Sequence, residues 1–296
     1  MKRGPSHLAR LIVSRIDISA PPASVTKWGA EICLDLGWHA STAEAFEAAE
    51  RWAPHMLALL RRELDELCKF GRFAVYAFNS SSTDLVQGSA FIEPCDSEGL
   101  KTAKAKRAHF ASYLGALREL TPRQFEALCT GVLNQLGVKE PVLTPYSADE
   151  GLDFYGRLDL ERRLLPDVVF PGLQTQLGVW MIGQAKHYSV GKVSTPDIRN
   201  LVGAVTLAKG HAFGSSVVKY KDLTIRVCDP VFYLFFTTSS LSSDAWTLLE
   251  RSGVVGMDGH MLSAYLAEQG IGLTQGAFDK AALISWLEAF GTFQKR

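Results

Sequence analysis

The residues with the clearest capacity for chemistry lie in two short strings near the middle of the chain. The first is Asp149-Glu150-Gly151-Leu152-Asp153, and the second is Gln184-Ala185-Lys186, which follows an apolar run. A carboxylate on one strand and a Gln-x-Lys on the next can build a metal-dependent phosphodiesterase site. The carboxylate holds a divalent cation that polarises the scissile phosphate and activates water, while the lysine stabilises the anion or the attacking hydroxide. These residue types, in this order, therefore indicate phosphodiester hydrolysis.

Both strings lie where the sequence pattern predicts β-strands. In residues 152–160 apolar and polar side chains alternate, and some are aromatic. Residues 179–186 begin with an apolar run and then switch to alternating polar residues. Side chains at i and i+2 share one face of a strand, so Gln184 and Lys186 should point the same way. If the two strands pair as a hairpin, Asp153 can face both. Similar strings also occur in ordinary turns and at solvated strand edges, so both readings stay open at this point.

A helix is predicted immediately upstream of the two strings. Thr121-Pro122-Arg123-Gln124 reads as a capping box with proline at the first helical position. The residues that follow, 125–137, carry the apolar stripe of an amphipathic helix that ends at a glycine. Glu126 lies beside this stripe in the first turn, where it could complement the helix dipole or reach the metal site.

From about Leu120 to Leu266 the chain resembles the Mrr-type restriction endonuclease catalytic domain, a branch of the PD-(D/E)xK nuclease superfamily. The matching motifs are the Phe125-Glu126 helix start, Asp149-x-Gly151-x-Asp153, Gln184-x-Lys186, the turn Phe236-Thr237-Thr238-Ser239 and the later Asp244-Ala245. The resemblance implies an α/β (α+β) fold of the restriction-endonuclease type, with a mixed central sheet flanked by helices.

The resemblance also implies roles for individual residues. Asp153 would be the principal metal ligand, Gln184 would replace the acidic residue of the commoner motif, and Lys186 would be the catalytic lysine. Glu126 would be an auxiliary metal or water contact. A neutral amide ligates a cation only through its carbonyl oxygen and brings no charge. We therefore expect Mg²⁺, with Mn²⁺ as a substitute, to bind weakly until DNA supplies further oxygen ligands.

The composition sets outer limits on these expectations. The chain has 296 residues, a formal net charge of zero and five cysteines without a CxxC pair. Zero net charge is mild evidence against nucleic-acid binding, although local patches matter more than the sum. The cysteine pattern argues against a zinc site and favours a reducing cytoplasm. No apolar stretch approaches the length that a membrane span needs. The sequence has no Gly-rich phosphate loop, which argues against an NTPase.

The organisation along the chain predicts two regions. Residues 1–112 read as a mainly helical N-terminal region with a β-hairpin, suited to target recognition, regulation or a partner contact, and residues 113–296 form the nuclease domain. The densest basic cluster includes Lys104, Lys106 and Arg107, which could contact DNA phosphates or form a solvated helix face. Lys192 and Arg199 flank a second predicted helix start, where a phosphate could bind.

The motifs predict a metal-dependent DNA endonuclease, and the resemblance implies a role in restriction or anti-phage defence. Its partners would be double-stranded DNA, a second copy of the chain in a homodimer or higher oligomer, and a defence-system protein. The main alternative is a catalytically silent nuclease-fold module that binds DNA, senses a signal or binds a partner. Neutral charge and Gln184 motivate that alternative, and intact Asp153 and Lys186 oppose it.

Overall fold

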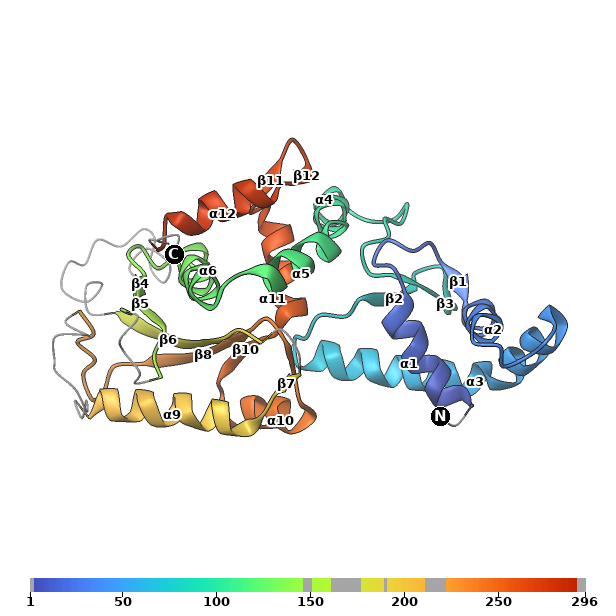
Figure 1. Ribbon diagram of the computed structural model, residues 1–296, viewed down its shortest axis with the longest axis horizontal. Coiled ribbons are helices and arrows are strands. Elements are labelled where there is room, and N and C mark those ends of the chain that lie inside the picture. The colour runs from blue at the N-terminus through green and yellow to red at the C-terminus, as the bar shows by residue number, and fades with distance from the viewer. Residues whose placement is uncertain (1–2, 146–150, 161–176, 189–190, 211–221, 292–296) are drawn as a thin grey trace. The chain divides into compact units, whose positions relative to one another are not determined.

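The computed structural model describes residues 3–145, 151–160, 177–188, 191–210 and 222–291 (Figure 1). By contacts, the chain divides into two compact units. Unit 1 comprises residues 1–111 and 267–270, and unit 2 comprises residues 112–266 and 271–296. The boundary expected from the sequence, after residue 112, lies beside this division, but the sequence did not indicate that a distant short segment joins unit 1.

Unit 1 is built mainly from helices around a small antiparallel sheet. The hairpin predicted for this region is confirmed, since β2 and β3 pair and β1 adds to β3. Apolar side chains from three helices and the hairpin form its core, including Ile12, Met56 and Tyr76. The elements are α1 (Pro5–Arg15), β1 (Ala23–Ser24), α2 (Val25–Asp35), α3 (Thr42–Lys69), β2 (Tyr76–Asn79), β3 (Ser82–Gly88) and α4 (Glu98–Arg107).

The basic cluster on α4 is engaged within unit 1. Lys104 is only 8% exposed, and its Nζ donates to Asp96 at 2.8 Å. Lys106 donates to the carbonyl oxygen of Glu268 at 3.0 Å, and Arg107 Nε donates to the Glu268 carboxylate at 2.6 Å. A phosphate could reach Lys104 only by breaking a nearly buried ion pair, so DNA contact at Lys104 stays a prediction that competes with Asp96. For Lys106 and Arg107, DNA contact stays a prediction that competes with Glu268.

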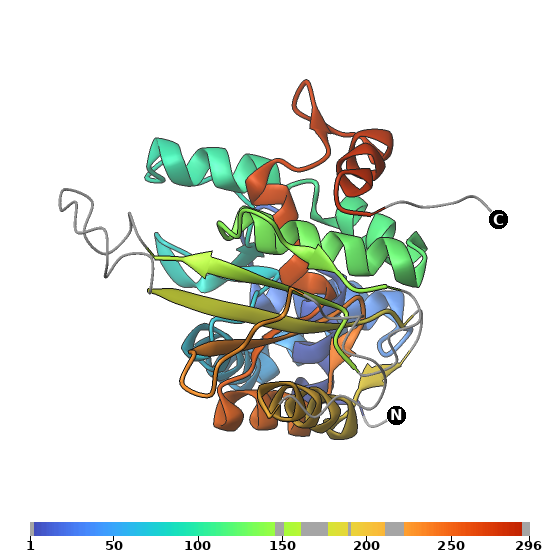
Figure 2. The ribbon, with the colours of Figure 1, turned by 90° about the vertical axis from the view of Figure 1, so that its left-hand side faces the viewer.

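Unit 2 contains a five-stranded mixed sheet between layers of helices, which confirms the predicted fold class. The strand order is β10-β8-β6-β5-β4, with β6, β8 and β10 parallel and β5 antiparallel to β6. In Figure 2, α6 lies on one face of this sheet and α9 on the other. The elements are α6 (Pro122–Gln135), β4 (Val142–Leu143), β5 (Phe154–Asp159), β6 (Gly178–Lys186), α9 (Thr195–Lys209), β8 (Val231–Thr237), α10 (Ser243–Ser252) and β10 (Val255–Met257).

Shorter elements complete the fold around this sheet. Strands β7 (Lys192–Val193) and β9 (Ser240–Leu241) form a parallel pair, and β11 (Leu273–Thr274) and β12 (Ala277–Phe278) form an antiparallel one. The remaining helices are α5 (Phe110–Glu119), α11 (Gly259–Gln269) and α12 (Lys280–Glu288). Within the described part of the chain, no helix combines the length and apolar character that a membrane crossing requires.

The pairing of β5 with β6 sets the position of the predicted site. Phe154 lies opposite Gly183, and a Cβ added to Gly183 would come within 2.2 Å of the Phe154 ring. Glycine therefore lets the ring lie flat across the neighbouring strand. Trp180 and Ile182 belong to the core under α9. Because side chains alternate along a strand, Gln184 follows them on the α9 face of the sheet.

Candidate active site

Asp153 lies immediately before β5 and is held against the end of β6. Its backbone N–H donates to Gly183 O at 3.0 Å, and its Oδ2 accepts a hydrogen bond from Ala185 N at 2.7 Å. The predicted hairpin pairing of the two motif strands is therefore confirmed. Asp149 and Glu150, which also belong to the first string, lie outside the described residues.

Gln184 and Lys186 lie two positions apart at the end of β6, of which Lys186 is the last residue. Gln184 is 4% exposed, and its Oε1 is buried without a hydrogen-bond partner among the described residues. A buried acceptor left unpaired costs about 1–3 kcal/mol. Such an atom is a favourable place for a cation or a ligand donor. Lys186 is partly exposed and has no ion-pair partner in the described part of the chain.

Glu126 is positioned by the start of α6. The predicted capping box is present, with Gln124 N donating to Thr121 Oγ1 at 3.3 Å and Thr121 N donating to Gln124 Oε1 at 2.9 Å. These bonds fix the first turn, in which Arg123 donates to Glu126 Oε2 at 2.7 Å. Arg123 also donates to the carbonyl oxygen of Thr144 at 2.8 Å. It therefore ties Glu126 to the chain segment that precedes Asp153.

Arg123 is the site residue that the sequence reasoning missed. It was treated only as part of the capping box, although its spacing from Glu126 carries a signal. Residues three apart on a helix are neighbours on its surface, so a pair of opposite charges at i and i+3 is expected to interact. Its bond to Thr144 had no comparable signal, because it joins residues 21 positions apart.

Burial raises the pKa of Asp153 from its ordinary 3.8 to about 6. The hydrogen bond from Ala185 N opposes this shift, the negative charge of Glu126 adds to it, and the positive charges of Lys186 and Arg123 lower the pKa. Asp153 is thus influenced by charges from α6 and β6 together. Asp153, Glu126, Arg123 and Lys186 thus lie close enough for their charges to interact, and Gln184 lies two residues before Lys186 on β6.

The donor atoms at this site suit a hard divalent cation. Two carboxylates and one orphaned amide oxygen are the ligand types that Mg²⁺ prefers. Among the described residues, no group of three or more His, Cys, Asp or Glu side chains could hold a metal ion. Any cation held by Asp153, Glu126 and Gln184 would therefore need water or phosphate oxygens as its remaining ligands.

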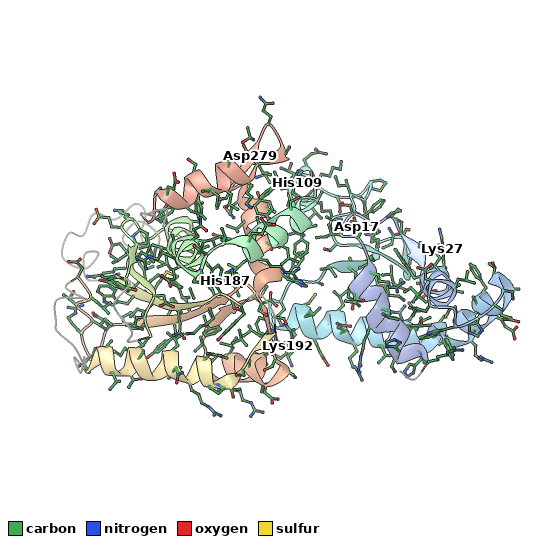
Figure 3. The ribbon with its side chains drawn as sticks, viewed as in Figure 1. Asp17, Lys27, His109, His187, Lys192 and Asp279 are labelled. Atoms are coloured by element: carbon green, nitrogen blue, oxygen red, sulfur yellow. The ribbon has the colours of Figure 1, made fainter. Side chains whose placement is uncertain are left out.

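The other predicted DNA contacts lie on exposed parts of unit 2. Lys192 is exposed on β7, and Arg199 is exposed in the first turns of α9. The ring of His187 packs edge-on against Phe125 of α6, with centroids 5.9 Å apart. Figure 3 labels His187 and Lys192 in this unit.

A mixed sheet with Asp153, Gln184 and Lys186 at one end is the arrangement that the resemblance implies. Residues 117–218 match the family model Mrr_cat, described as a restriction endonuclease. This match falls within the stretch that carries the motifs and confirms the resemblance to Mrr-type restriction endonuclease domains.

Solved structures of two restriction endonucleases are also similar to this chain. The MspJI restriction endonuclease in complex with a 27-mer oligonucleotide shares 19% identity over 69% of this chain and 42% of its own, with a TM-score of 0.43. The DNA modification-dependent restriction endonuclease AspBHI shares 16% identity over 72% of this chain and 46% of its own, with a TM-score of 0.39. The chain thus spans less than half the length of either enzyme. No curated protein sequence matched it.

Proposed function

We propose that this protein is a Mg²⁺-dependent endonuclease that hydrolyses phosphodiester bonds in double-stranded DNA. The observation that carries this proposal is the buried Gln184 Oε1, which has no partner among the described residues and lies on the strand that holds the Asp153 carboxylate. In a domain that matches restriction endonucleases, an orphaned oxygen beside a carboxylate is suited to a cation.

Each side chain has a separate task in the proposed reaction. Asp153, Gln184 and Glu126 would hold Mg²⁺, or Mn²⁺ in its place. When bound, the cation would polarise the scissile phosphate and lower the pKa of a water molecule. Lys186 extends from the same face of β6 as Gln184 and offsets the negative charge that develops on the attacked phosphate. Arg123 holds Glu126 in place through the bond at 2.7 Å.

The small number of protein charges makes metal binding depend on DNA. Only Asp153 and Glu126 bring negative charge, and Arg123 already compensates part of it. Mg²⁺ commonly keeps several waters and binds through one or two carboxylates plus substrate phosphates. We therefore expect weak binding of Mg²⁺ to the free protein and stronger binding to the complex with DNA.

The biological setting forms a further part of the proposal. We assign the protein to restriction or anti-phage defence, with unit 1 as a recognition or regulatory region that binds the target or a defence-system partner. One site hydrolyses one strand at a time, so double-strand cutting favours a homodimer or a higher oligomer. The five cysteines are free, in keeping with a reducing cytoplasm.

A catalytically silent nuclease-fold module is the second candidate. Two observations favour it: the metal-facing position holds the neutral Gln184, and the chain has no net charge. Both functions predict DNA binding, and only the first predicts metal-dependent cutting.

The deciding experiment compares methylated and unmethylated plasmids incubated with Mg²⁺, Mn²⁺ or EDTA. We expect wild-type protein to cut with metal and Lys186→Ala to lose at least about 100-fold in rate, as for removal of a charge-stabilising group. Lys139→Ala, at an exposed position of unit 2, is the matched control and should cut normally. Normal cutting by Lys186→Ala would refute the assignment of this site. Absence of cutting by wild type on every plasmid would favour the silent module.

A further inference from the structure

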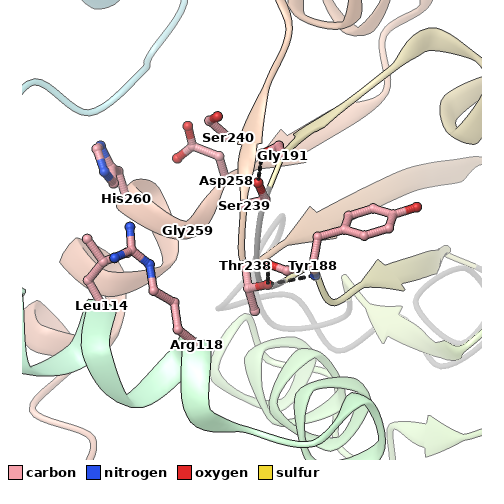
Figure 4. Close-up of a pocket in the computed structure, with 10 residues that line it drawn as sticks. All are labelled: Leu114, Arg118, Tyr188, Gly191, Thr238, Ser239, Ser240, Asp258, Gly259 and His260. Carbon is pink, nitrogen blue, oxygen red and sulfur yellow. Dashed lines mark hydrogen bonds between the residues drawn. The ribbon is translucent and has the colours of Figure 1, made fainter.

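A pocket of about 300 Å³ lies in unit 2, and none of the residues of the proposed active site lines it (Figure 4). Its walls come from α5, from the loops after β6 and β8, and from the start of α11. The lining residues that matter here are Arg118, Thr238, Ser240, Asp258, Gly259 and His260.

The pocket is continuous with the end of the sheet that carries Lys186. Thr238 follows β8 directly, and its N–H donates to Lys186 O at 3.3 Å. Tyr188, two residues beyond Lys186, also lines the pocket and is bonded in both directions to the Thr238 hydroxyl, at 3.1 and 3.2 Å. The pocket therefore lies at the end of β6 that Lys186 terminates.

The start of α11 forms a rigid wall of the pocket. Gly259 N donates to Ser239 O at 3.2 Å, and a Cβ added to Gly259 would come within 2.3 Å of Thr238 O. Asp258 caps the helix, because its Oδ1 accepts from Met261 N at 3.0 Å. Part of its negative charge is thus offset by the helix N-terminus.

Arg118 supplies the cationic group. It is exposed, and it has no ion pair or hydrogen bond with the described residues. In Figure 4 its guanidinium extends toward His260 at the start of α11. The Thr238 and Ser239 hydroxyls already donate to the carbonyl oxygens of Tyr188 and Gly191, whereas the Arg118 guanidinium and the Ser240 hydroxyl can receive an anion.

We propose that this pocket binds a backbone phosphate of the DNA substrate, adjacent to the phosphate that is cut. This inference rests on the proposed function. A guanidinium presents a planar fork of donors that matches phosphate oxygens. The pocket lies at the same end of β6 as Lys186, and a contact to a neighbouring backbone phosphate would position the duplex without reading its sequence. The negative charge of Asp258, which also lines the pocket, would repel an anion and limit how tightly it binds.

The two charges allow a test in which the expected effects have opposite directions. DNA affinity is measured in EDTA by fluorescence anisotropy of a labelled duplex at several salt concentrations. We expect Arg118→Ala to weaken binding by about 3- to 30-fold and to reduce the slope of log K against log salt by about 1. Arg118→Lys should keep most of the slope. Asp258→Asn retains the helix cap and should strengthen binding by about 2- to 5-fold.

Arg251→Ala is the matched control, since Arg251 is an exposed arginine of unit 2 outside the pocket. Unchanged affinity and slope in Arg118→Ala, or weaker binding in Asp258→Asn, would overturn the inference. A duplex with a neutral methylphosphonate next to the cut position should lose affinity for wild type but not for Arg118→Ala.

Inorganic phosphate at matched ionic strength separates the two sources of the same chemistry. If it binds wild type and Arg118→Ala keeps full DNA affinity, the pocket takes free phosphate and the inference is wrong. A protein that never cuts DNA but shows the Arg118 and Asp258 effects would refute the proposed function and support the pocket. Cutting without those effects would do the reverse.

Discussion

Asp153 is the residue at which burial and function conflict most directly. Its carboxylate is needed as an anion for a cation, yet burial raises its pKa to about 6. An acid whose pKa is higher in the folded than in the unfolded protein destabilises the fold once it is ionised. The cost is absent below pH 3.8, grows between pH 3.8 and 6, and is complete above pH 6. At 1.36 kcal/mol per tenfold change, the full cost is about 3 kcal/mol.

The first prediction is that Asp153→Asn stabilises the metal-free protein above pH 6. The amide oxygen can still accept from Ala185 N, while the buried charge is gone. We expect the free energy of unfolding in EDTA to rise by up to about 3 kcal/mol at pH 8 and by much less at pH 4.5. Urea unfolding at both pH values measures this free energy. Asp159→Asn is the control, because the Asp159 side chain is half-exposed. Equal stability of variant and wild type at pH 8 would contradict the inference that burying the ionised Asp153 carboxylate destabilises the fold.

Arg123 gives a second prediction at the same scale, conditional on nuclease activity. Its charge lowers the pKa of Asp153 and its guanidinium holds Glu126. Arg123→Gln should therefore move the acid limb of the pH–rate profile to higher pH and slow cutting at pH 7 by about 10-fold. Arg123→Lys should restore the position of the limb more than the rate. An acid limb that does not move in Arg123→Gln would show that Arg123 is only structural.

At the scale of elements, the close approach of β5 to β6 places the Asp153 carboxylate against the N–H of Ala185, the residue between Gln184 and Lys186. The Phe154 ring lies across Gly183 and stacks on Phe236 of β8, with centroids 5.5 Å apart. The Phe154 ring of β5 thus packs over Gly183 of β6, which has no side chain, and against the Phe236 ring of β8. Any group larger than hydrogen at position 183 must displace the Phe154 ring.

The third prediction follows from this contact. Gly183→Ala should destabilise unit 2 by about 1–3 kcal/mol, because an added methyl group in a packed core forces side chains from their rotamers. Gly203→Ala is the matched control. Gly203 is an exposed residue of α9, and no atom lies within 4 Å of a Cβ added there. The substitution should therefore stabilise the helix by up to about 1 kcal/mol. Denaturant midpoints compare the two, and a neutral Gly183→Ala would show that the ring can move freely.

At the scale of the whole molecule, the chain passes out of unit 1 and returns to it for four residues. Ala267–Gly270 belongs to unit 1, where Glu268 binds Arg107 through its carboxylate and Lys106 through its carbonyl oxygen. Residues 161 positions apart thus stabilise the same unit. Unit 1 is therefore not a continuous stretch of sequence.

The fourth prediction tests this organisation. Glu268→Gln removes a charge-assisted bond from a partly buried pair and should destabilise unit 1 by about 1 kcal/mol. Glu98→Gln breaks the Lys101 ion pair, whose glutamate is 89% exposed, and should change stability by less than about 0.5 kcal/mol. Hydrogen exchange of α4 reports the difference. Equal protection in both variants would place Glu268 outside the structure of unit 1.

Several features of the fold and site were determined by local sequence. The capping box of α6, the alternation of β5 and β6 and the apolar run of β8 are each encoded within a few residues, because hydrogen bonds and side-chain periodicity act over short separations. Those elements and their order were enough to predict a mixed α/β sheet, and the motifs that they carry led to the family that the comparison confirmed.

Tertiary structure alone decided which charged groups meet. Nothing near Lys104 or Arg107 in the sequence shows that one is buried against Asp96 and the other pairs with Glu268. Similarly, Arg118 and Asp258 reach one pocket only because α5 and α11 pack beside the end of β8. Charge partners depend on distances in space, and those distances follow from packing and strand register, which local patterns do not specify.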